Sequence, residues 1–519
     1  MSTTGTITRR VAIQQGVAAA AALSLHAATK PPTKSAAKPN ILFLVVDDLR
    51  PELNCYGHAW IHSPHIDSIA KAGMQFNHAY VQQAVCSPSR SSLLTGTRPD
   101  TTKVWDLKTP FRKALPNVAT LPEHFKNNGY FAQGMGKIFH PGLEDPQSFS
   151  VDWWTANNAP VYANVYHQDL SGHNHDDDVA RETGKNGPAF ESADVPDNFY
   201  RDGQVADYAV AQLGKAASQG KPFFFAVGFA KPHLPFVAPK RYWDLYDPAK
   251  IELAPNPYHP HNAPDYSVLG TSEMRQYDGI PKEGPVPDDL ARQLKHGYYA
   301  AVSYTDAQIG RVLAELDRLK LRENTIIVLW GDHGWKLGEH GEWTKHTNME
   351  NDTNAPMMIS VPGMKNAGVQ CNALVEFVDL YPTLCELAGL ALPPQLEGHS
   401  MKPLLDNPKQ PWKLAAVSQY PRFHGPRALM GYSLRTADHR FTIWVKDADH
   451  SQVDSIELYD HTTDPQENEN VAGRKENAEL VRQLTELWRQ GWKANLPGAK
   501  SPATGSIVAE KWETEAVSA

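Results

Sequence analysis

The stretch Asn40-Ile41-Leu42-Phe43-Leu44-Val45-Val46-Asp47-Asp48 joins a continuous apolar run to two adjacent carboxylates. The run does not alternate apolar with polar residues, which is typical of a strand buried on both faces of a parallel sheet. Ligands of open α/β sheets bind at the carboxyl ends of strands, so Asp47 and Asp48 suit a hard cation. A helix N-cap or a turn is the ordinary alternative for such a pair.

Two later segments, 223–227 and 325–330, have the same apolar texture. Helical patterns at 121–128 and 202–213 separate these runs, and the clearest helix spans about 290–319. Strands that alternate with helices predict an α/β fold. The last run ends in Gly331-Asp332-His333-Gly334, so two acidic strand ends can converge on one site.

The remaining chain suggests three parts. Residues 250–290 carry seven prolines and little periodicity, which indicates a long ordered loop. After residue 411 the pattern predicts a hairpin at 431–445, a short strand at 456–460 and a helix near 480–488. We therefore expect an export signal and linker at 1–38, a main domain at 39–410 and a smaller α+β subdomain at 411–519.

Composition excludes several classes of protein. The chain has 519 residues and a net charge of 50 − 58 = −8, with no long block of either sign, so we expect no general nucleic-acid binding. Mean hydropathy is −0.47 and no apolar run of about 18 residues occurs, so we expect no integral membrane span. Four cysteines in so long a chain are too few for a disulfide scaffold, and the pairing state of Cys371 and Cys385 stays open.

The N-terminus has the features of an export signal. Thr8-Arg9-Arg10 precedes an apolar, Ala-rich stretch at 11–25 and an Ala/Pro/Lys-rich stretch at 27–38. This order resembles a twin-arginine signal with a linker and implies a periplasmic or extracellular protein. The alternative is an Ala-rich terminus with a chance arginine pair. The cleavage site is left open.

One short string carries the most specific chemistry. In Cys86-Ser87-Pro88-Ser89-Arg90, Pro88 fits the first turn of a helix, which places Cys86 at a helix N-terminus. A lone cysteine there is usually a buried structural residue. The whole string, followed by Leu93-Leu94-Thr95-Gly96, resembles the signature of type I sulfatases, in which the cysteine is oxidised to formylglycine. Its position between two acidic strand ends strengthens this resemblance.

The resemblance extends over nearly the whole chain after residue 40. Strings similar to the iduronate-2-sulfatase branch occur at 47–51, 82–86, 136–142, 231–236 and 332–343. Residues 458–460, 464–465 and 467–468 resemble the sulfatase C-terminal subdomain. The resemblance implies the alkaline phosphatase fold, with a mostly parallel central sheet flanked by helices and a smaller C-terminal α+β subdomain.

Family roles transfer position by position. The resemblance implies a calcium site formed by Asp47, Asp48, Asp332, His333 and an oxygen of modified Cys86. His333 is the weakest of these ligands, because calcium prefers oxygen. Arg90 and Lys137 match residues that hold the formylglycine hydrate and the sulfate. His140 matches the residue beside the hydrate, and His233 and Lys345 match residues that contact the sulfate and the leaving oxygen.

This residue set suits sulfate ester hydrolysis. A divalent ion, Arg and Lys neutralise the anionic oxygens around sulfur in the transition state. A serine nucleophile would leave a stable sulfate ester, whereas a hydrated aldehyde offers a second hydroxyl to expel sulfate. The acid and base roles fall among Asp332, His140 and His233 or Lys345, in an order that the sequence leaves open.

We therefore expect an exported, calcium-dependent exo-sulfatase that acts on a 2-O-sulfated uronic acid or a related sulfated sugar. A formylglycine-generating maturation enzyme and a sulfated saccharide would be its partners. The alternatives are a phosphodiesterase or phosphonate hydrolase of the same superfamily, and an inactive carbohydrate-binding homologue with unmodified Cys86. Trp335 is either a sugar platform or a packed aromatic. The natural sugar, the sulfate position and the oligomeric state are left open.

Overall fold

The computed structural model describes residues 1–2, 38–156, 187–268, 273–424 and 427–499. The predicted export signal falls almost entirely on residues 3–37, outside the described residues. Contacts divide the chain into a unit at Met1–Lys38 and a compact unit at Pro39–Ala519, and the following description concerns the second unit. None of the described helices has an apolar stretch of the length that crossing a bilayer requires.

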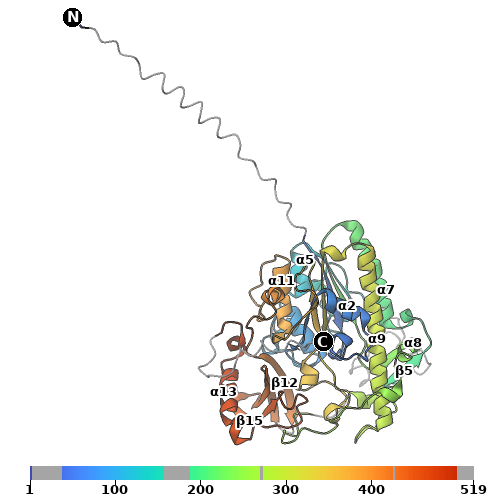
Figure 1. Ribbon diagram of the computed structural model, residues 1–519, viewed down its shortest axis with the longest axis vertical. Helices are drawn as coiled ribbons and strands as arrows, with labels where there is room; N and C mark the ends of the chain where they lie inside the picture. Colours follow the sequence, from blue (N-terminus) through green and yellow to red (C-terminus); the bar gives the residue numbers. More distant parts are fainter. Residues whose placement is uncertain (3–37, 157–186, 269–272, 425–426, 500–519) are drawn as a thin grey trace. The chain divides into compact units, whose positions relative to one another are not determined.

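A seven-stranded sheet forms the centre of this unit (Figure 1). β9 runs antiparallel to its neighbours β8 and β2, and the remaining neighbours pair in parallel, which confirms the predicted α/β fold with a mostly parallel sheet. In spatial order the strands are β10 (Val369–Cys371), β2 (Met74–Phe76), β9 (Met357–Ser360), β8 (Thr325–Gly331), β1 (Asn40–Val46), β6 (Phe223–Phe229) and β4 (Phe131–Gly136).

Strand β1 is buried on both faces, as its apolar run predicts. Leu42 and Leu44 face one core, which is covered by α2 (Pro64–Ala72), α7 (Arg201–Gln219) and α9 (Asp288–Arg318). Ile41 and Phe43 face the other, covered by α3 (Cys86–Thr95), α5 (Leu121–Asn127) and α11 (Leu380–Leu387). Figure 1 shows α7 and α9 on one side of the sheet and α5 and α11 on the other. Each such buried side chain contributes roughly 1.5–3 kcal/mol to stability.

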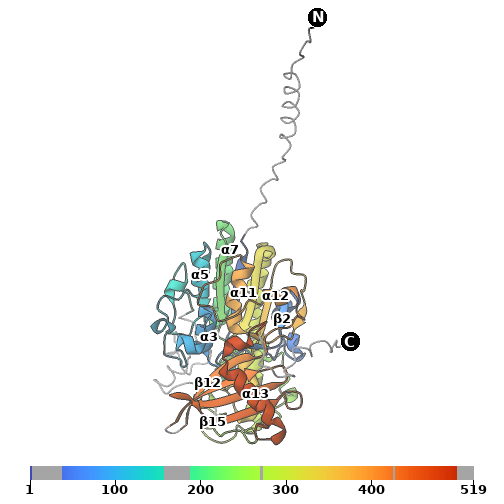
Figure 2. The same ribbon diagram turned by 90° about the vertical axis from the view of Figure 1, so that its left-hand side faces the viewer.

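The C-terminal part is an antiparallel four-stranded sheet with a covering helix (Figure 2). Its elements are β12 (Ala416–His424), β13 (Arg427–Arg435), β14 (His439–Lys446), β15 (Asp449–Asp460) and α13 (Ala478–Arg489). Leu484 and Leu487 of α13 pack into the core of this sheet. β15 begins seven residues before the predicted strand, because its first five residues are polar or exposed and carry no apolar signal. The boundary at residue 410 stays a prediction.

The smaller elements connect these parts. Two-stranded ladders are formed by β3 (Ala79–Tyr80) with β11 (Val375–Glu376) and by β5 (Phe190–Ala193) with β7 (Phe236–Pro239). The short helices are α4 (Pro99–Thr102), α8 (Lys240–Trp243), α10 (Glu350–Thr353) and α12 (Lys402–Asp406). Between α8 and α9 the described residues form only short 3-10 turns, in agreement with the proline-rich loop predicted there. The four cysteines form no disulfide.

Candidate active site

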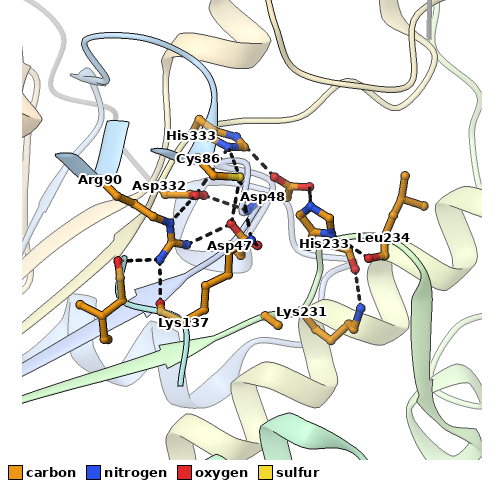
Figure 3. Close-up of polar contacts among 12 residues, drawn as sticks. Asp47, Asp48, Cys86, Arg90, Lys137, Lys231, His233, Leu234, Asp332 and His333 are labelled. Carbon is orange, nitrogen blue, oxygen red and sulfur yellow. Dashed lines mark hydrogen bonds and ion pairs between the residues drawn. The ribbon is translucent and has the colours of Figure 1, made fainter. Parts of the chain in front are cut away.

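The predicted convergence of two acidic strand ends is present at the carboxyl edge of the sheet (Figure 3). Val46 of β1 pairs with Gly331 of β8, so the residues that follow each strand are neighbours. The backbone N–H of Asp48 donates to Oδ1 of Asp332 at 3.0 Å. Asp47, Asp48, Asp332 and His333 are fully buried. Parallel pairing in register thus brings together side chains almost 300 residues apart.

Cys86 begins α3, as predicted, and lies against this acidic edge. Its Sγ is 3.3 Å from Nε2 of His333 and 3.6 Å from Oδ1 of Asp47. Burial and the neighbouring Asp47 carboxylate raise the pKa of the Cys86 thiol well above its usual value. An unmodified Cys86 is therefore a neutral thiol and not an activated thiolate nucleophile.

Arg90, one turn further along α3, ties three chain segments together. Its Nε donates to Asp332 at 2.9 Å, its Nη2 donates to Asp47 at 3.0 Å, and its Nη1 donates to the carbonyls of Lys137 and Ile138. The guanidinium has five N–H donors, and these contacts use four. Arg90 is fully buried, so it fixes the two acidic strand ends relative to α3 and the loop after β4.

The loop after β4 supplies a second cation. Nζ of Lys137 lies 2.6 Å from Oδ2 of Asp47 and 4.0 Å from Sγ of Cys86. His140 is buried on the same loop, three residues later. The position of Lys137 between the thiol and a carboxylate agrees with its predicted place beside the reacting group, whereas the roles of both residues stay predictions.

His233 and Lys345 face the cluster from the side of Asp48. Nζ of Lys345 lies 3.3 Å from Asp48, and Nε2 of His233 lies 3.9 Å from Oδ2 of Asp48. The His233 ring is held by a 2.7 Å hydrogen bond between Nδ1 and the carbonyl of Leu234. This contact makes Nδ1 the donor, so Nε2 is the nitrogen that faces the site.

The loop that carries His233 is fixed from two directions. Asp202 of α7 accepts hydrogen bonds from the backbone N–H groups of Ala230 and Lys231, at 2.9 and 2.8 Å. Nζ of Lys231 donates to the carbonyls of His233 and Pro235, each at 2.7 Å. These contacts hold the backbone on both sides of the ring.

Glu273 is a site residue that sequence reasoning missed. Its side chain is buried, and its carboxylate lies 2.9 Å from Nζ of Lys345 and 3.4 Å from Nε2 of His233. It comes from the proline-rich segment before α9, where no periodicity or motif distinguishes one acidic residue from another. Only the folded structure identifies Glu273, because its carboxylate lies beside the basic side chains of Lys345 and His233.

The electrostatics of the cluster differ between its carboxylates. Burial alone would raise the pKa of Asp47, but Lys137 and Arg90 hold that pKa well below its usual value. Burial raises the pKa of Asp48 well above its usual value despite Lys345, and burial together with the Asp47 charge raises the pKa of Asp332. Burial therefore disfavours the ionised forms of Asp48 and Asp332, although Lys345 and Arg90 lie close to them.

The carboxylates of this cluster fit a hard cation. Ligand atoms of Asp47, Asp48, Cys86 and His333 lie within 4.8 Å of one another, and Asp332 adjoins them with Oδ2 at 3.5 Å from Nε2 of His333. Within the described part of the chain, Oδ1 of Asp48 is buried and accepts no hydrogen bond, although Nζ of Lys345 lies 3.3 Å from it as an ion-pair partner. An added divalent ion would use the oxygens of Asp48 and Asp332 as ligands and would favour their ionised forms.

Trp335 is a packed aromatic and not an exposed sugar platform. Its side chain is fully buried, with its ring edge-on to Phe236 at 6.4 Å between centroids. Nζ of Lys345 lies 4.8 Å from the centre of the Trp335 ring. The tryptophan therefore supports Lys345 from behind through a cation–π contact.

Comparison with known proteins agrees with this fold. The model of the Sulfatase family matches residues 39–390, and that of the N-sulphoglucosamine sulphohydrolase C-terminal region matches residues 338–492. The chain is 35% identical to iduronate 2-sulfatase of Mus musculus and 34% identical to that of Homo sapiens, over 86% of this chain and 93% of each relative. A sulfatase of Formosa agariphila is 29% identical, over 89% of both chains.

Solved structures share the fold. A protein in complex with its substrate D-glucosamine-2-N,6-O-disulfate superposes with a TM-score of 0.68 at 24% identity, over 88% of this chain and 98% of its own. Phosphonate monoester hydrolase of Agrobacterium radiobacter superposes with a TM-score of 0.70 at 21% identity, over 87% and 95%. With the sequence matches, these findings confirm the predicted alkaline phosphatase superfamily fold. The chain belongs to the sulfatase family and is a sulfuric ester hydrolase.

Proposed function

We propose that this protein is a calcium-dependent exo-sulfatase that removes sulfate from sulfated sugars by means of a formylglycine made from Cys86. The observation that carries the proposal is the position of Cys86 Sγ, which lies within 4.0 Å of His333, Asp47 and Lys137. A group at this position has both a carboxylate for a metal and a lysine for an anion beside it.

Asp47, Asp48, Asp332, His333 and the modified side chain at 86 would hold the calcium ion. When bound, the ion would withdraw negative charge from the sulfate oxygens, and formylglycine would supply the attacking hydroxyl. Lys137 and Lys345 would bind the remaining sulfate oxygens from opposite sides, because their Nζ atoms flank the cluster at Asp47 and Asp48.

His233 would hold or release a proton at the leaving oxygen. Its Nε2 faces the site, and Glu273 lies beside it to favour the charged ring. Burial, Lys345 and Lys137 nevertheless lower the pKa of His233 to about 3 in the described arrangement. The single negative charge of a sulfate ester bound between these lysines would offset part of their charge, so substrate binding itself would promote protonation of His233.

The relatives suggest the substrate class. Iduronate 2-sulfatase is the name of the two relatives that are 34–35% identical, and the notable strings shared with that branch surround the site. We propose a 2-O-sulfated uronic acid, or a similar unit of a polysaccharide fragment, as the natural substrate. Export through the twin-arginine route and a formylglycine-generating maturation enzyme complete the proposal.

The deciding experiment compares turnover of an aryl sulfate with that of an aryl phosphodiester, followed by a panel of sulfated disaccharides. Preference for the sulfate ester is expected, whereas preference for the phosphodiester would favour a phosphonate or phosphodiester hydrolase. The intact mass of the peptide that contains Cys86 should show conversion of the thiol to an aldehyde. An unmodified thiol without turnover would instead support an inactive carbohydrate-binding homologue.

A further inference from the structure

A second pocket lies where the C-terminal subdomain meets the main domain. It encloses about 440 Å³ and is lined by the start of α4 on one side and by β12, β13 and the end of α13 on the other. That volume falls within the usual range for ligand pockets, about 300–1,000 Å³. Arg98 in its wall follows the C-terminus of α3, and the ten residues of α3 span about 15 Å from Cys86. The pocket is therefore distinct from the candidate active site.

One wall of this pocket is aromatic. The ring of Tyr432 lies between His450, at 5.4 Å between centroids, and Trp488, at 6.0 Å. Trp492 adds a second indole to the lining. Trp488 and Trp492 are only partly buried, so indole surface remains accessible at the pocket. Aromatic rings of this kind pack against the apolar C–H faces of pyranose rings.

The acids in the lining are already satisfied. The Asp100 carboxylate accepts hydrogen bonds from Gln419 and from the Tyr432 hydroxyl, each at 2.9 Å. The Glu397 carboxylate accepts from the N–H of Arg98 and the hydroxyl of Thr101, each at 2.6 Å. These hydrogen bonds fix the orientation of both carboxylates in the lining of the pocket.

The basic side chains in and near this pocket have fewer hydrogen-bond and ion-pair partners than the acids. The Arg98 guanidinium pairs with Glu376, yet its Nε has no hydrogen-bond partner among the described residues. Arg489 and Lys493 are exposed and have no ion-pair partner within the part of the chain that the structure describes. Arg98 and Lys493 both lie against the Trp492 ring, at 5.0 and 5.4 Å from its centre. The lining holds two arginines, Arg98 and Arg489, and two acids, Asp100 and Glu397, and Arg489 is the exposed base that is available to an anionic ligand.

We propose that this pocket is a second binding site for an acidic sugar unit, a uronate or a sulfated pyranose. Aromatic surface would pack on the ring face, and Arg489 would bind the carboxylate or sulfate as a planar two-donor group. The inference rests on the proposed function in one respect, namely that the sugar unit belongs to a sulfated polysaccharide. Such a site would hold the polymer on the enzyme while chain ends enter the active site.

The test measures direct binding to the full chain carrying Cys86→Ala, so that no ligand is consumed. The probe is a sulfated, uronate-containing hexasaccharide, titrated by calorimetry into this protein and into versions that also carry Arg489→Ala, Trp492→Leu or Arg482→Ala. Arg482 is the matched control, because it is an exposed arginine of the same helix α13 that pairs with Glu479 outside the pocket. Thermal unfolding checks that each variant folds.

We expect Arg489→Ala to weaken one component of binding by about tenfold or more, as for loss of a hydrogen bond to a charged group. Trp492→Leu should weaken the same component, and Arg482→Ala should leave it unchanged. Equal losses for both arginines, or no loss for either pocket variant, would overturn the proposal. A dimer that Arg489→Ala dissociates would also overturn it, because a second copy would then fill the pocket. Failure to hydrolyse aryl sulfate would count against the proposed function alone.

Discussion

The carboxylate of Glu273 lies 2.9 Å from Nζ of Lys345, and the same carboxylate reaches His233 at 3.4 Å. One acid from a loop without regular structure thus joins the two basic groups proposed to meet the sulfate and the leaving oxygen. Since Lys345 is also 3.3 Å from Asp48, Glu273 competes with a proposed metal ligand for this lysine. We infer that Glu273 positions Lys345 and His233 for the substrate.

Glu273→Gln should therefore impair catalysis more than folding. The amide keeps the shape of the side chain but removes the charge that holds Lys345, so we expect kcat/KM to fall roughly 10- to 100-fold, or about 1.4–2.7 kcal/mol. Glu283→Gln, an exposed acid of the same segment, is the control. Steady-state kinetics on an aryl sulfate together with Tm would check this. Unchanged kinetics with a large drop in Tm would assign Glu273 a purely structural role.

Cys86→Ala and Cys86→Ser should both abolish multiple turnover while the fold remains intact. Neither side chain can form the hydrated aldehyde, and a serine can at most transfer one sulfate group to itself. The measurement is product released per enzyme over many equivalents of aryl sulfate, with circular dichroism for the fold. A serine variant that turns over at nearly the parental rate would refute the formylglycine mechanism.

Asp332→Asn should lower calcium affinity and remove most activity. The substitution takes a formal charge from a site built of hard ligands and also removes the charged partner of Arg90 Nε. Asp306→Asn is a control, because Asp306 is a buried carboxylate of α9 that binds backbone N–H groups of α2, away from the site. Calcium content by elemental analysis and activity after chelation are the readouts. Full activity in metal-free enzyme would contradict the calcium assignment.

The C-terminal sheet should make stability depend on pH through Glu457. Burial raises the pKa of this carboxyl group from 4.5 to about 7, although Trp444 and Tyr459 donate hydrogen bonds to it. The folded state therefore keeps a proton that the unfolded chain loses between about pH 4.5 and 7. Its contribution to stability is fully present below pH 4.5 and falls by about 3 kcal/mol as the pH rises to 7.

Glu457→Gln removes this titration, so the stability of the variant relative to the parent should increase across that range. Thermal unfolding at several pH values measures the difference. Glu476→Gln, at an exposed position before α13, should show no such trend. A difference between Glu457→Gln and the parent that is constant from pH 4.5 to 7.5 would mean that the carboxyl group is ionised in the folded state.

Replacing Arg9 and Arg10 together with Lys should leave an active, aldehyde-bearing enzyme in the cytoplasm. The twin-arginine route carries folded proteins, so the proposed route requires the chain to fold in the reducing cytoplasm before export. Cell fractionation, activity and the mass of the Cys86 peptide report the outcome. Normal export, or a retained protein whose Cys86 is still a thiol, would contradict this order of modification, folding and transport.

Most of the architecture is predictable because it depends on local signals. The apolar run before Asp47 and the helical face from Leu294 to Leu316 determine β1 and α9. The sequence string around Cys86 identifies the site because the start of α3 is a local feature. The contact between Glu273 and Lys345 is different, since it depends on how a long irregular loop packs, and no periodicity encodes that path. Burial of Trp335 is likewise a result of tertiary packing.

The side chain of Cys86 is only 2% exposed in the folded protein. If Cys86 is converted to formylglycine as proposed, a maturation enzyme could not reach the surrounding pentapeptide while α3 is packed in the core, so a molecule that folds with a thiol at this position would keep it. The proportion of competent enzyme in a preparation is then fixed during synthesis and does not improve with storage, added calcium or late supply of the maturation enzyme. Yield of active protein in a foreign host would depend on the rate of modification relative to the rate of folding.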